Sequence, residues 1–314
     1  MPKTSQFIAI QMDNFDKIRY TTDTTVLLAT ELQSRGYSVF CYTPNNLSYQ
    51  NNRLYAKGRY VRFFDDENNF YEVIKADTLD LEKATLVLIR QNPPFDMNYI
   101  TNTYLLEKLQ GKTLVLNDPR EIRNNPEKLM IYNFPDFITP SIIGFEMEQL
   151  EEFYLNHKDV IIKPLYNFGG NEVKRITTLT EFKTILPEYI KKHEQVIVQK
   201  FLPAVFKGDK RVLIVDGEIM GALKRVPKEG QVAANLAAGG HAEQTELTVR
   251  EIEVCQKVGK FLKPRNLFLA GIDLLDGYLL EINITSPTAF KTYNSLYKAN
   301  IEQQVIDVLL KKIH

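Results

Sequence analysis

Residues 271–288 read GIDLLDGYLLEINITSPT, an apolar stretch interrupted by acidic and amide side chains. Alternate side chains of a β-strand point to opposite faces. The apolar face would then hold Leu280, Ile282 and Ile284, and the polar face would hold Glu281, Asn283 and Thr285. An ordinary strand with one solvated face shows this alternation. A strand that presents oxygen ligands to a metal ion shows it as well, so the stretch alone allows both interpretations.

A further acid lies on the preceding strand. Asp273 precedes Glu281 by eight residues, across a turn that Asp276-Gly277 predicts. A two-residue loop would place the two acids on opposite faces, whereas a three-residue loop with Gly277 left-handed would place both on one face. We expect the three-residue loop, with Asn283 beside the acids. Two carboxylates and an amide oxygen suit Mg²⁺ or Mn²⁺, and the alternative is a solvated polar face.

The N-terminal part of the chain has the pattern of a parallel α/β sheet. Its predicted strands are Phe7–Met12, Tyr37–Tyr42, Thr85–Arg90 and Thr113–Asp118. A first helix begins after Asp23 as N-cap and ends at Gly36, and a second lies near residues 98–109. The last two strands end in polar residues, and ligands tend to bind at the carboxyl edge of such a sheet.

The rest of the chain alternates strands, glycine loops and helices. Asn125 and Pro126 predict the start of a helix, as N-cap and first helical residue. A hairpin is expected around Asp216-Gly217. Thr248 and Glu251 have the spacing of a capping box at the start of an amphipathic helix. A strand pair over residues 270–284 precedes a helical C-terminus.

Composition is that of an ordinary globular protein. The chain has 314 residues, 44% of them hydrophobic and 25% charged, and a formal net charge of zero. We therefore expect no bulk electrostatic attraction to nucleic acid or to a membrane. No signal peptide or membrane span is apparent. The two cysteines, Cys41 and Cys255, form no zinc-like or CxxC pattern, so we expect reduced thiols and a cytoplasmic location.

Two lysines and a glycine loop could bind phosphate groups. Lys163 ends the apolar strand VIIKP, and Lys128 lies in the first turns of the helix predicted after Asn125. The stretch FGGN, with Gly169 and Gly170, supplies backbone amides that could cover phosphates. Each lysine could equally be a surface side chain. Neither GxxxxGK[ST] nor GxGxxG occurs, so the common nucleotide-binding fingerprints are absent.

Two arginines lie near a loop of small residues. Arg211 and Arg225 belong to the predicted hairpin, and the loop NLAAGG spans Asn235 to Gly240. Arginine suits bidentate binding of carboxylate or phosphate, and small side chains let a ligand approach the backbone closely. A plain hinge loop remains the alternative. The four histidines have no catalytic or metal-binding spacing, so we do not expect nucleophilic triad chemistry.

Seven stretches in order along the chain resemble motifs of the ATP-grasp superfamily, and specifically of the prokaryotic-type glutathione synthetases. They are NPPFD, IIKPL, LPA, GDKRVL, VDGE, NLAAGG and EINITSPT. The resemblance covers essentially the whole chain. It implies an α/β fold with α+β character, in which ATP lies between two antiparallel sheets. It further implies an N-terminal parallel α/β domain (residues 1–122), a central lid-bearing domain (123–203) and a C-terminal catalytic domain (204–314).

The resemblance also implies a role for individual residues. ATP would be bound by Lys128, Lys163, Gly169, Gly170, Gln199, Lys200, Phe201, Leu202 and Lys210. The metal, Mg²⁺ or Mn²⁺, would be held by Asp273, Glu281 and Asn283. Arg225, Arg211 and Lys163 would act in catalysis, with Arg225 against the transferred phosphoryl group. The acceptor acid would lie among Arg90, Arg211, Asn235, Gly239, Gly240, Ser286 and Thr288.

The implied reaction is amide ligation. ATP phosphorylates a carboxylate, an amine attacks the acyl phosphate, and phosphate leaves. In this family the acid is γ-glutamylcysteine and the amine is glycine, and the enzymes form homo-oligomers, dimers or tetramers. No nucleic-acid or membrane partner is implied.

The chain departs from the family pattern on the substrate side. Where the family usually reads RKDPPFD, PLDGMGG and ETRG, this chain reads RQNPPFD, PLYNFGG and QVAA. Gln91, Asn92 and Tyr166 are therefore unusual. These departures keep open a ligase that joins a different γ-glutamyl or peptide-like acid to an amine. A weakly catalytic ATP-binding protein is a third possibility, against which the retained lysines, arginines and metal-binding positions argue.

Overall fold

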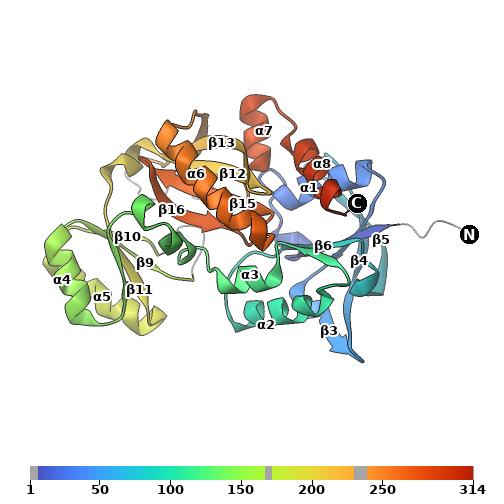
Figure 1. Cartoon of the computed structure of the whole chain (residues 1–314), viewed down its shortest axis with the longest axis horizontal. Helices are drawn as coiled ribbons and strands as arrows, with labels where there is room; N and C mark the ends of the chain where they lie inside the picture. The colour runs from blue at the N-terminus through green and yellow to red at the C-terminus, as the bar shows by residue number, and fades with distance from the viewer. Residues whose placement is uncertain (1–5, 167–171, 230–238, 314) are drawn as a thin grey trace, which may run out of the picture.

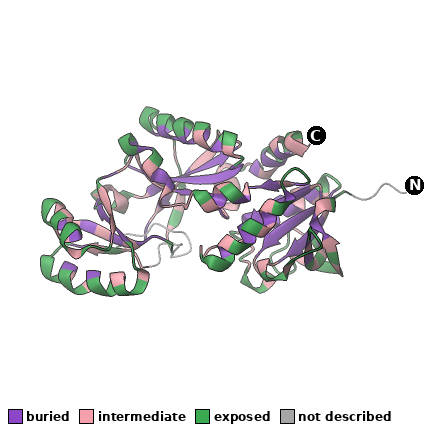
Figure 2. Ribbon diagram, turned by 60° about the horizontal axis from the view of Figure 1, so that its bottom comes forward, coloured by how far each residue is buried: buried purple, intermediate pink, exposed green. Residues whose placement is uncertain are grey.

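The computed structural model describes residues 6–166, 172–229 and 239–313, and three β-sheets lie along its long axis (Figure 1). The predicted loop residues Gly169, Gly170 and Asn235 lie outside the described residues. The strands in the interior of the sheets are buried, and the outer faces of the helices are exposed (Figure 2). None of the helices among the described residues is long and apolar enough to cross a membrane.

The first sheet has a parallel centre with an antiparallel extension. Strands β2 (Ser38–Tyr42), β1 (Phe7–Met12), β6 (Leu86–Arg90) and β7 (Leu114–Leu116) run parallel in that order. Their buried apolar runs are typical of a sheet covered on both faces. This confirms the predicted parallel sheet. The sequence analysis missed the antiparallel strands β3 (Leu47–Gln50), β4 (Arg53–Phe63) and β5 (Tyr71–Asp80).

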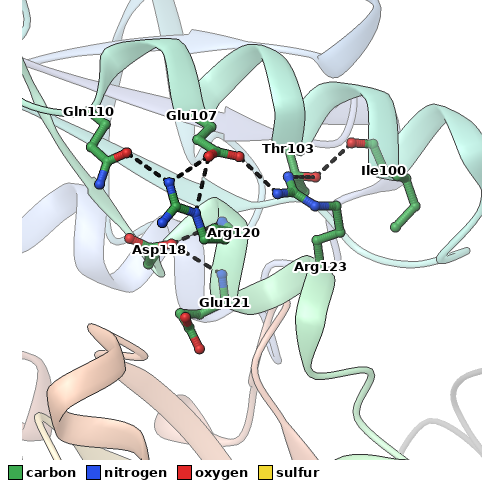
Figure 3. Close-up of polar contacts among 8 residues, drawn as sticks. All are labelled: Ile100, Thr103, Glu107, Gln110, Asp118, Arg120, Glu121 and Arg123. Carbon is green, nitrogen blue, oxygen red and sulfur yellow. Dashed lines mark hydrogen bonds and ion pairs between the residues drawn. The ribbon is translucent and has the colours of Figure 1, made fainter.

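Helices cover this sheet as predicted. Helix α1 (Thr24–Ser34) begins where Asp23 accepts a hydrogen bond from the Val26 amide. Helix α2 (Met97–Leu106) continues in a 3₁₀ turn to Leu109, and α3 (Pro119–Asn124) packs beside it. Figure 3 shows Glu107 accepting hydrogen bonds from Arg120 and Arg123, which join these two helices.

The helix predicted after Asn125 does not form. Asp118 caps α3 with Pro119 as its first residue, and Asn125 is instead the C-cap of α3. Residues 126–129 are a turn that leads into the 3₁₀ helix Met130–Asn133. The capping and proline signals at 125–126 were therefore misread, because the same Asx-Pro pair seven residues earlier starts the helix. Lys128 consequently lies in a turn and not in a helix.

The second sheet is antiparallel, with the order β10-β9-β11-β8. Its strands are β8 (Ser141–Gly144), β9 (Val160–Pro164), β10 (Lys174–Ile176) and β11 (Val196–Lys200). Helices α4 (Met147–His157) and α5 (Leu179–His193) pack on one face through a core that includes Val160 and Ile162 of β9. Because side chains alternate along β9, Lys163 points to the face that these helices leave uncovered.

The third sheet is also antiparallel, with the order β14-β13-β12-β15-β16. Its strands are β12 (Asp209–Val215), β13 (Glu218–Val226), β14 (His241–Gln244), β15 (Leu269–Leu275) and β16 (Tyr278–Asn283). Helix α6 (Val249–Leu262) covers one face and begins with the predicted capping box of Thr248 and Glu251. Helices α7 (Phe290–Tyr297) and α8 (Ile301–Ile313) return to α1 of the first sheet (Figure 1).

The turn between β15 and β16 differs from the prediction. It is a two-residue turn, with left-handed backbone at both Asp276 (φ 52°) and Gly277 (φ 76°). A β-bulge at Leu280 adds one residue to β16, so that Asp273 still pairs directly with Glu281. The expected three-residue loop was therefore wrong. The two acids nevertheless share a face. The extra residue of the bulge shifts the register by one position, which has the same effect as a third residue in the loop.

Helix α6 approaches the third sheet through two glycines, and this contact generates a prediction. A Cβ atom on Gly259 would lie 2.0 Å from the backbone oxygen of Gly217, which cannot move aside without shifting the β12–β13 turn. We expect Gly259→Ala to lower the free energy of unfolding by about 1–3 kcal/mol. Gly144→Ala is the matched control, because nothing lies within 4 Å of its added Cβ atom. Equal urea midpoints for the two variants would contradict the prediction.

Candidate active site

Four buried charged side chains form the centre of the candidate site. Arg211 donates to both carboxylate oxygens of Asp273, at 2.5 and 2.9 Å. Arg225 donates to both oxygens of Asp209, at 2.8 and 2.6 Å, and its Nη2 lies 3.0 Å from Asp273. All four residues are buried. The two bidentate pairs are therefore joined to each other, because Asp273 also contacts Arg225.

Strand register explains this cluster. Asp209 pairs directly with Arg225 across β12 and β13, and Arg211 pairs directly with Asp273 across β12 and β15. Directly opposed residues of an antiparallel pair have their side chains on the same face. Gly271 lies two residues before Asp273, and a Cβ atom there would come within 3.0 Å of the Arg211 guanidinium. The glycine therefore leaves the space in which Arg211 reaches Asp273.

The charges in the cluster stabilise one another. Burial alone would raise the pKa of Asp273, but Arg211 and Arg225 outweigh it and hold that pKa below its usual value. Burial likewise opposes the charge of Arg225, but Asp273 and Asp209 raise its pKa. The pKa of Asp209 is raised, because burial outweighs the attraction of Arg225. Asp273 is therefore an anion in a site that two cations hold in place.

The oxygen donors predicted for a metal lie next to this cluster. Glu281 is directly opposite Asp273, and Asn283 lies 3.3 Å from Asp273 through its amide nitrogen. No group of three or more His, Cys, Asp and Glu side chains that could hold a metal occurs within residues 6–166, 172–229 and 239–313. A set of two carboxylates and an amide fits Mg²⁺, which protein carboxylates typically bind together with substrate phosphates.

Lys163 faces these acids from the second sheet. Its ammonium donates to the side-chain oxygen of Gln199 at 3.1 Å, and Gln199 in turn donates to Thr139 at 2.5 Å. Burial lowers the pKa of Lys163 to about 8. Glu281 and Asp273 partly offset this effect, whereas Lys128 adds to it. Lys163 and the acids of the third sheet are thus close enough to influence one another's charge.

Lys128 reaches the same place from the turn after α3. Its ammonium lies 3.5 Å from Glu281 and donates to the backbone oxygen of Leu165 at 3.4 Å. The preceding residue, Glu127, accepts three hydrogen bonds at 2.8–2.9 Å from the Ile284 amide and from the amide and hydroxyl of Thr285. The sequence analysis missed Glu127. Its position beside Lys128 was the available signal, but nothing in the sequence indicated contact with the end of β16.

Of the other residues predicted to bind ATP, four lie at the end of β11 and one lies away from the buried cluster. Gln199 is buried and Lys200 exposed at the end of β11, where Phe201 packs under the Arg175 guanidinium at 3.9 Å. Leu202 follows and is partly buried. Lys210 is not brought to the cluster, because it alternates with Arg211 along β12 and pairs with Glu251 of α6 at 2.7 Å.

Of the residues predicted to surround the acid, Arg90 and Ser286 meet at the carboxyl edge of the first sheet, whereas Arg211 lies in the buried cluster of the third sheet. Arg90 is buried, donates to Thr25 and to the Pro287 backbone oxygen, and has no carboxylate partner within the described part of the chain; burial lowers its pKa to about 10. Ser286 donates to the Arg90 backbone oxygen, and Thr288 is exposed. The last two predicted residues, Gly239 and Gly240, precede β14.

Solved structures with a similar fold include a D-cycloserine synthetase and an ATP-grasp ligase. D-cycloserine synthetase DcsG superposes with a TM-score of 0.69 at 12% identity, over 98% of this chain and 100% of the other. The ATP-grasp ligase PsnB in complex with a minimal precursor superposes with a TM-score of 0.64 at 17% identity, over 99% and 100%. These similarities confirm that the chain has the ATP-grasp fold.

Sequence comparison identifies the family. Residues 7–123 match the N-terminal domain of prokaryotic glutathione synthetase, and residues 127–298 match its ATP-grasp domain. The glutathione synthetase of Agrobacterium fabrum is 38% identical over 97% of this chain and 96% of its own length. That of Brucella melitensis is 40% identical over 94% and 95%. The chain belongs to the prokaryotic glutathione synthetase family. The predicted class of enzyme, an ATP-dependent ligase, is confirmed.

The lowered pKa of Lys163 predicts a pH dependence of nucleotide binding. As the pH rises through about 8, Lys163 loses its charge, and its attraction for phosphate is lost with it. The dissociation constant of a non-hydrolysable ATP analogue with Mg²⁺ should therefore rise between pH 7 and pH 9, by up to roughly tenfold. Lys163→Arg keeps its charge over this range and should show no such rise. Calorimetric titrations of both proteins measure this. If the dissociation constant changes equally with pH in the parent protein and in Lys163→Arg, Lys163 is not the group responsible.

Proposed function

We propose that the chain joins γ-glutamylcysteine to glycine, with conversion of ATP to ADP and phosphate, and so makes glutathione. The observation that carries the proposal is the convergence of Lys163, Lys128 and the Arg211–Arg225 pair on the acids Asp273 and Glu281. Cations from the second and third sheets and from the turn after α3 meet the oxygen ligands of the third sheet there. A polyanion with a divalent metal fits such a site.

Residue roles follow from these positions. Lys128 and Lys163 bind ATP phosphates, and the end of β11 from Gln199 to Leu202 borders the nucleotide base. Asp273, Glu281 and Asn283 hold Mg²⁺, with Mn²⁺ as a second choice. The bound metal shields the charge of the phosphates and polarises the one that is transferred. Arg225 stabilises the charge on that phosphoryl group, and Arg211 orients both Asp273 and the acid.

The reaction proceeds in two displacements. An oxygen of the cysteinyl carboxylate attacks the terminal phosphorus of ATP, and the bond to ADP breaks, which gives an acyl phosphate. The glycine nitrogen then attacks the acyl carbon and loses a proton, and inorganic phosphate leaves with the electrons of the C–O bond. Arg211 and Arg225 neither gain nor lose a proton. They provide fixed positive charge where negative charge accumulates.

We also infer the domain boundaries, the cellular location and the oligomeric state. The proposed domains are residues 1–122, 123–203 and 204–314, each built around one of the three sheets. A cytoplasmic location follows from the need for ATP and a reduced thiol substrate. Assembly into a homodimer or homotetramer is carried over from the family.

A second candidate is ligation of a different acid. Gln91 accepts a hydrogen bond from Gln11 at 2.9 Å, and Asn92 donates to Asp13 through its side chain at 2.7 Å. The family usually has lysine and aspartate at positions 91 and 92. Two uncharged side chains at these positions favour an acid whose recognised group differs from that of γ-glutamylcysteine.

Turnover with defined pairs of substrates tests the function. With Mg-ATP, γ-glutamylcysteine and glycine, we expect one phosphate released per glutathione formed, measured by phosphate detection and product mass. Omission of glycine should leave little phosphate release, because the acyl phosphate has no amine acceptor. Phosphate release only with another acid would refute glutathione synthesis and support the second candidate, whereas none with any acid would refute ligase activity.

Arg225→Lys isolates the proposed catalytic role. Lysine keeps the positive charge between Asp209 and Asp273 but cannot make both bonds to Asp209. We expect kcat to fall by roughly a hundredfold while KM for ATP changes little. The reason is that the contact of the guanidinium with the transferred phosphoryl group strengthens mainly in the transition state. Arg250→Lys is the control, since Arg250 binds backbone oxygens outside the cluster. Near-parental kcat in Arg225→Lys would exclude the role.

A further inference from the structure

A small pocket opens where the three sheets meet. It lies at the ends of β6, β9 and β16 and is partly open to solvent. Its walls are apolar and are made by Pro93, Phe95, Pro126, Leu165 and the ring of Tyr166. Pockets that bind small organic groups are typically walled in this way, with a few polar side chains that fix orientation.

The polar side of the pocket borders the candidate active site. It is formed by Glu127, Lys128 and Thr285. Thr285 already donates to Glu127, so these two groups satisfy each other. Lys128 lies 3.5 Å from Glu281, which pairs with Asp273. An acid whose carboxylate reaches the phosphate-binding lysine would therefore place its neighbouring atoms at the mouth of this pocket.

Two aromatic rings define one wall. The ring of Tyr166 stacks on that of Phe95, with centroids 6.4 Å apart and planes inclined by 17°. Phe95 is supported by the buried Tyr99, at 5.1 Å. Tyr166 itself is 47% exposed, so the fold does not depend on burying it. The family usually has aspartate at this position, which cannot form such a wall.

We propose that this pocket receives the side chain next to the activated carboxylate, and that Phe95 and Tyr166 determine which side chains fit. The inference rests on the proposed function, because it takes the carboxylate to be activated beside Lys128. The apolar walls favour an uncharged side chain, since a charged one would lose its hydration there without a partner. A thiol suits the site, because sulfur makes favourable contacts with aromatic rings.

Selectivity between two acids tests this role. The measured quantity is the ratio of kcat/KM for γ-glutamylcysteine to that for γ-glutamylleucine, at saturating Mg-ATP and glycine. Tyr166→Ala removes the ring and should lower this ratio by about tenfold or more. Tyr166→Phe keeps the ring and should preserve the ratio. The KM for ATP should stay the same in both variants, because the ring faces the acid and not the nucleotide.

Two further variants sharpen the comparison. Phe95→Leu keeps an apolar wall but loses the stacking partner, and should lower the ratio in the same direction as Tyr166→Ala. Tyr49→Ala removes a tyrosine of similar exposure, 43%, on β3, and should leave both the ratio and the rate unchanged. Thermal unfolding of each variant shows whether a lost rate reflects lost structure.

The results of these experiments distinguish a wrong role for the pocket from a wrong assignment of the substrate. An unchanged ratio in Tyr166→Ala, or an equal loss in Tyr166→Phe, would overturn the role of the ring even if the parent protein makes glutathione. If the parent instead ligates another acid, the proposed substrate is wrong. The same variants are then compared on that acid and on its analogue with a leucine side chain, and an unchanged ratio there overturns the pocket as well.

Discussion

The buried pairing of Arg211 with Asp273 is the constraint on which the rest of the site depends. Removing Asp273 would break the bidentate pair and leave the buried Arg211 without this partner, which typically costs about 3–5 kcal/mol. The pairing also holds the Asp273 carboxylate ionised beside β16, where Glu281 is directly opposite and Asn283 donates to it through its amide nitrogen. Gly271 is required next to it, since any side chain there would meet the guanidinium. The carboxylate proposed to bind the metal is thus held in place by the sheet itself.

A second set of contacts fixes how the three sheets meet. Asn117, at the end of β7, donates to the Leu269 and Ile284 backbone oxygens and accepts from the Leu269 amide. Glu127 holds the residues that follow β16. The polar tip of β7 was expected at a ligand-binding edge, but it ties the first sheet to the third. The position of Lys128 depends on the contacts of Glu127, because Lys128 reaches Glu281 from a turn and not from a helix.

Most elements with strong local signals were predicted correctly, although the Asn125-Pro126 signal was misleading, and elements without such signals were missed. The parallel strands, the cap at Asp23, the capping box at Thr248 and the hairpin at Asp216-Gly217 are present. Strands β3 to β5 were missed because β5 is largely exposed and lacks an apolar alternation. The pairing of Asp273 with Glu281 was predicted through the wrong turn, since no residue pattern indicated the bulge at Leu280. Glu127 was missed because its contact spans more than 150 residues of sequence.

Charge balance explains why the site should select metal-bound ATP over free ATP. Four cations meet there, Lys128, Lys163, Arg211 and Arg225, and four carboxylates accompany them, Glu127, Asp209, Asp273 and Glu281. The protein groups therefore nearly cancel, and free ATP would bring uncompensated negative charge against Asp273 and Glu281. A divalent cation between those acids and the phosphates removes that repulsion. Lys163, already weakened as a cation by burial, cannot substitute for the metal. The arginines do not replace the metal either, because the charge of each is already largely matched by Asp209 and Asp273, which engage its Nε and Nη2 donors.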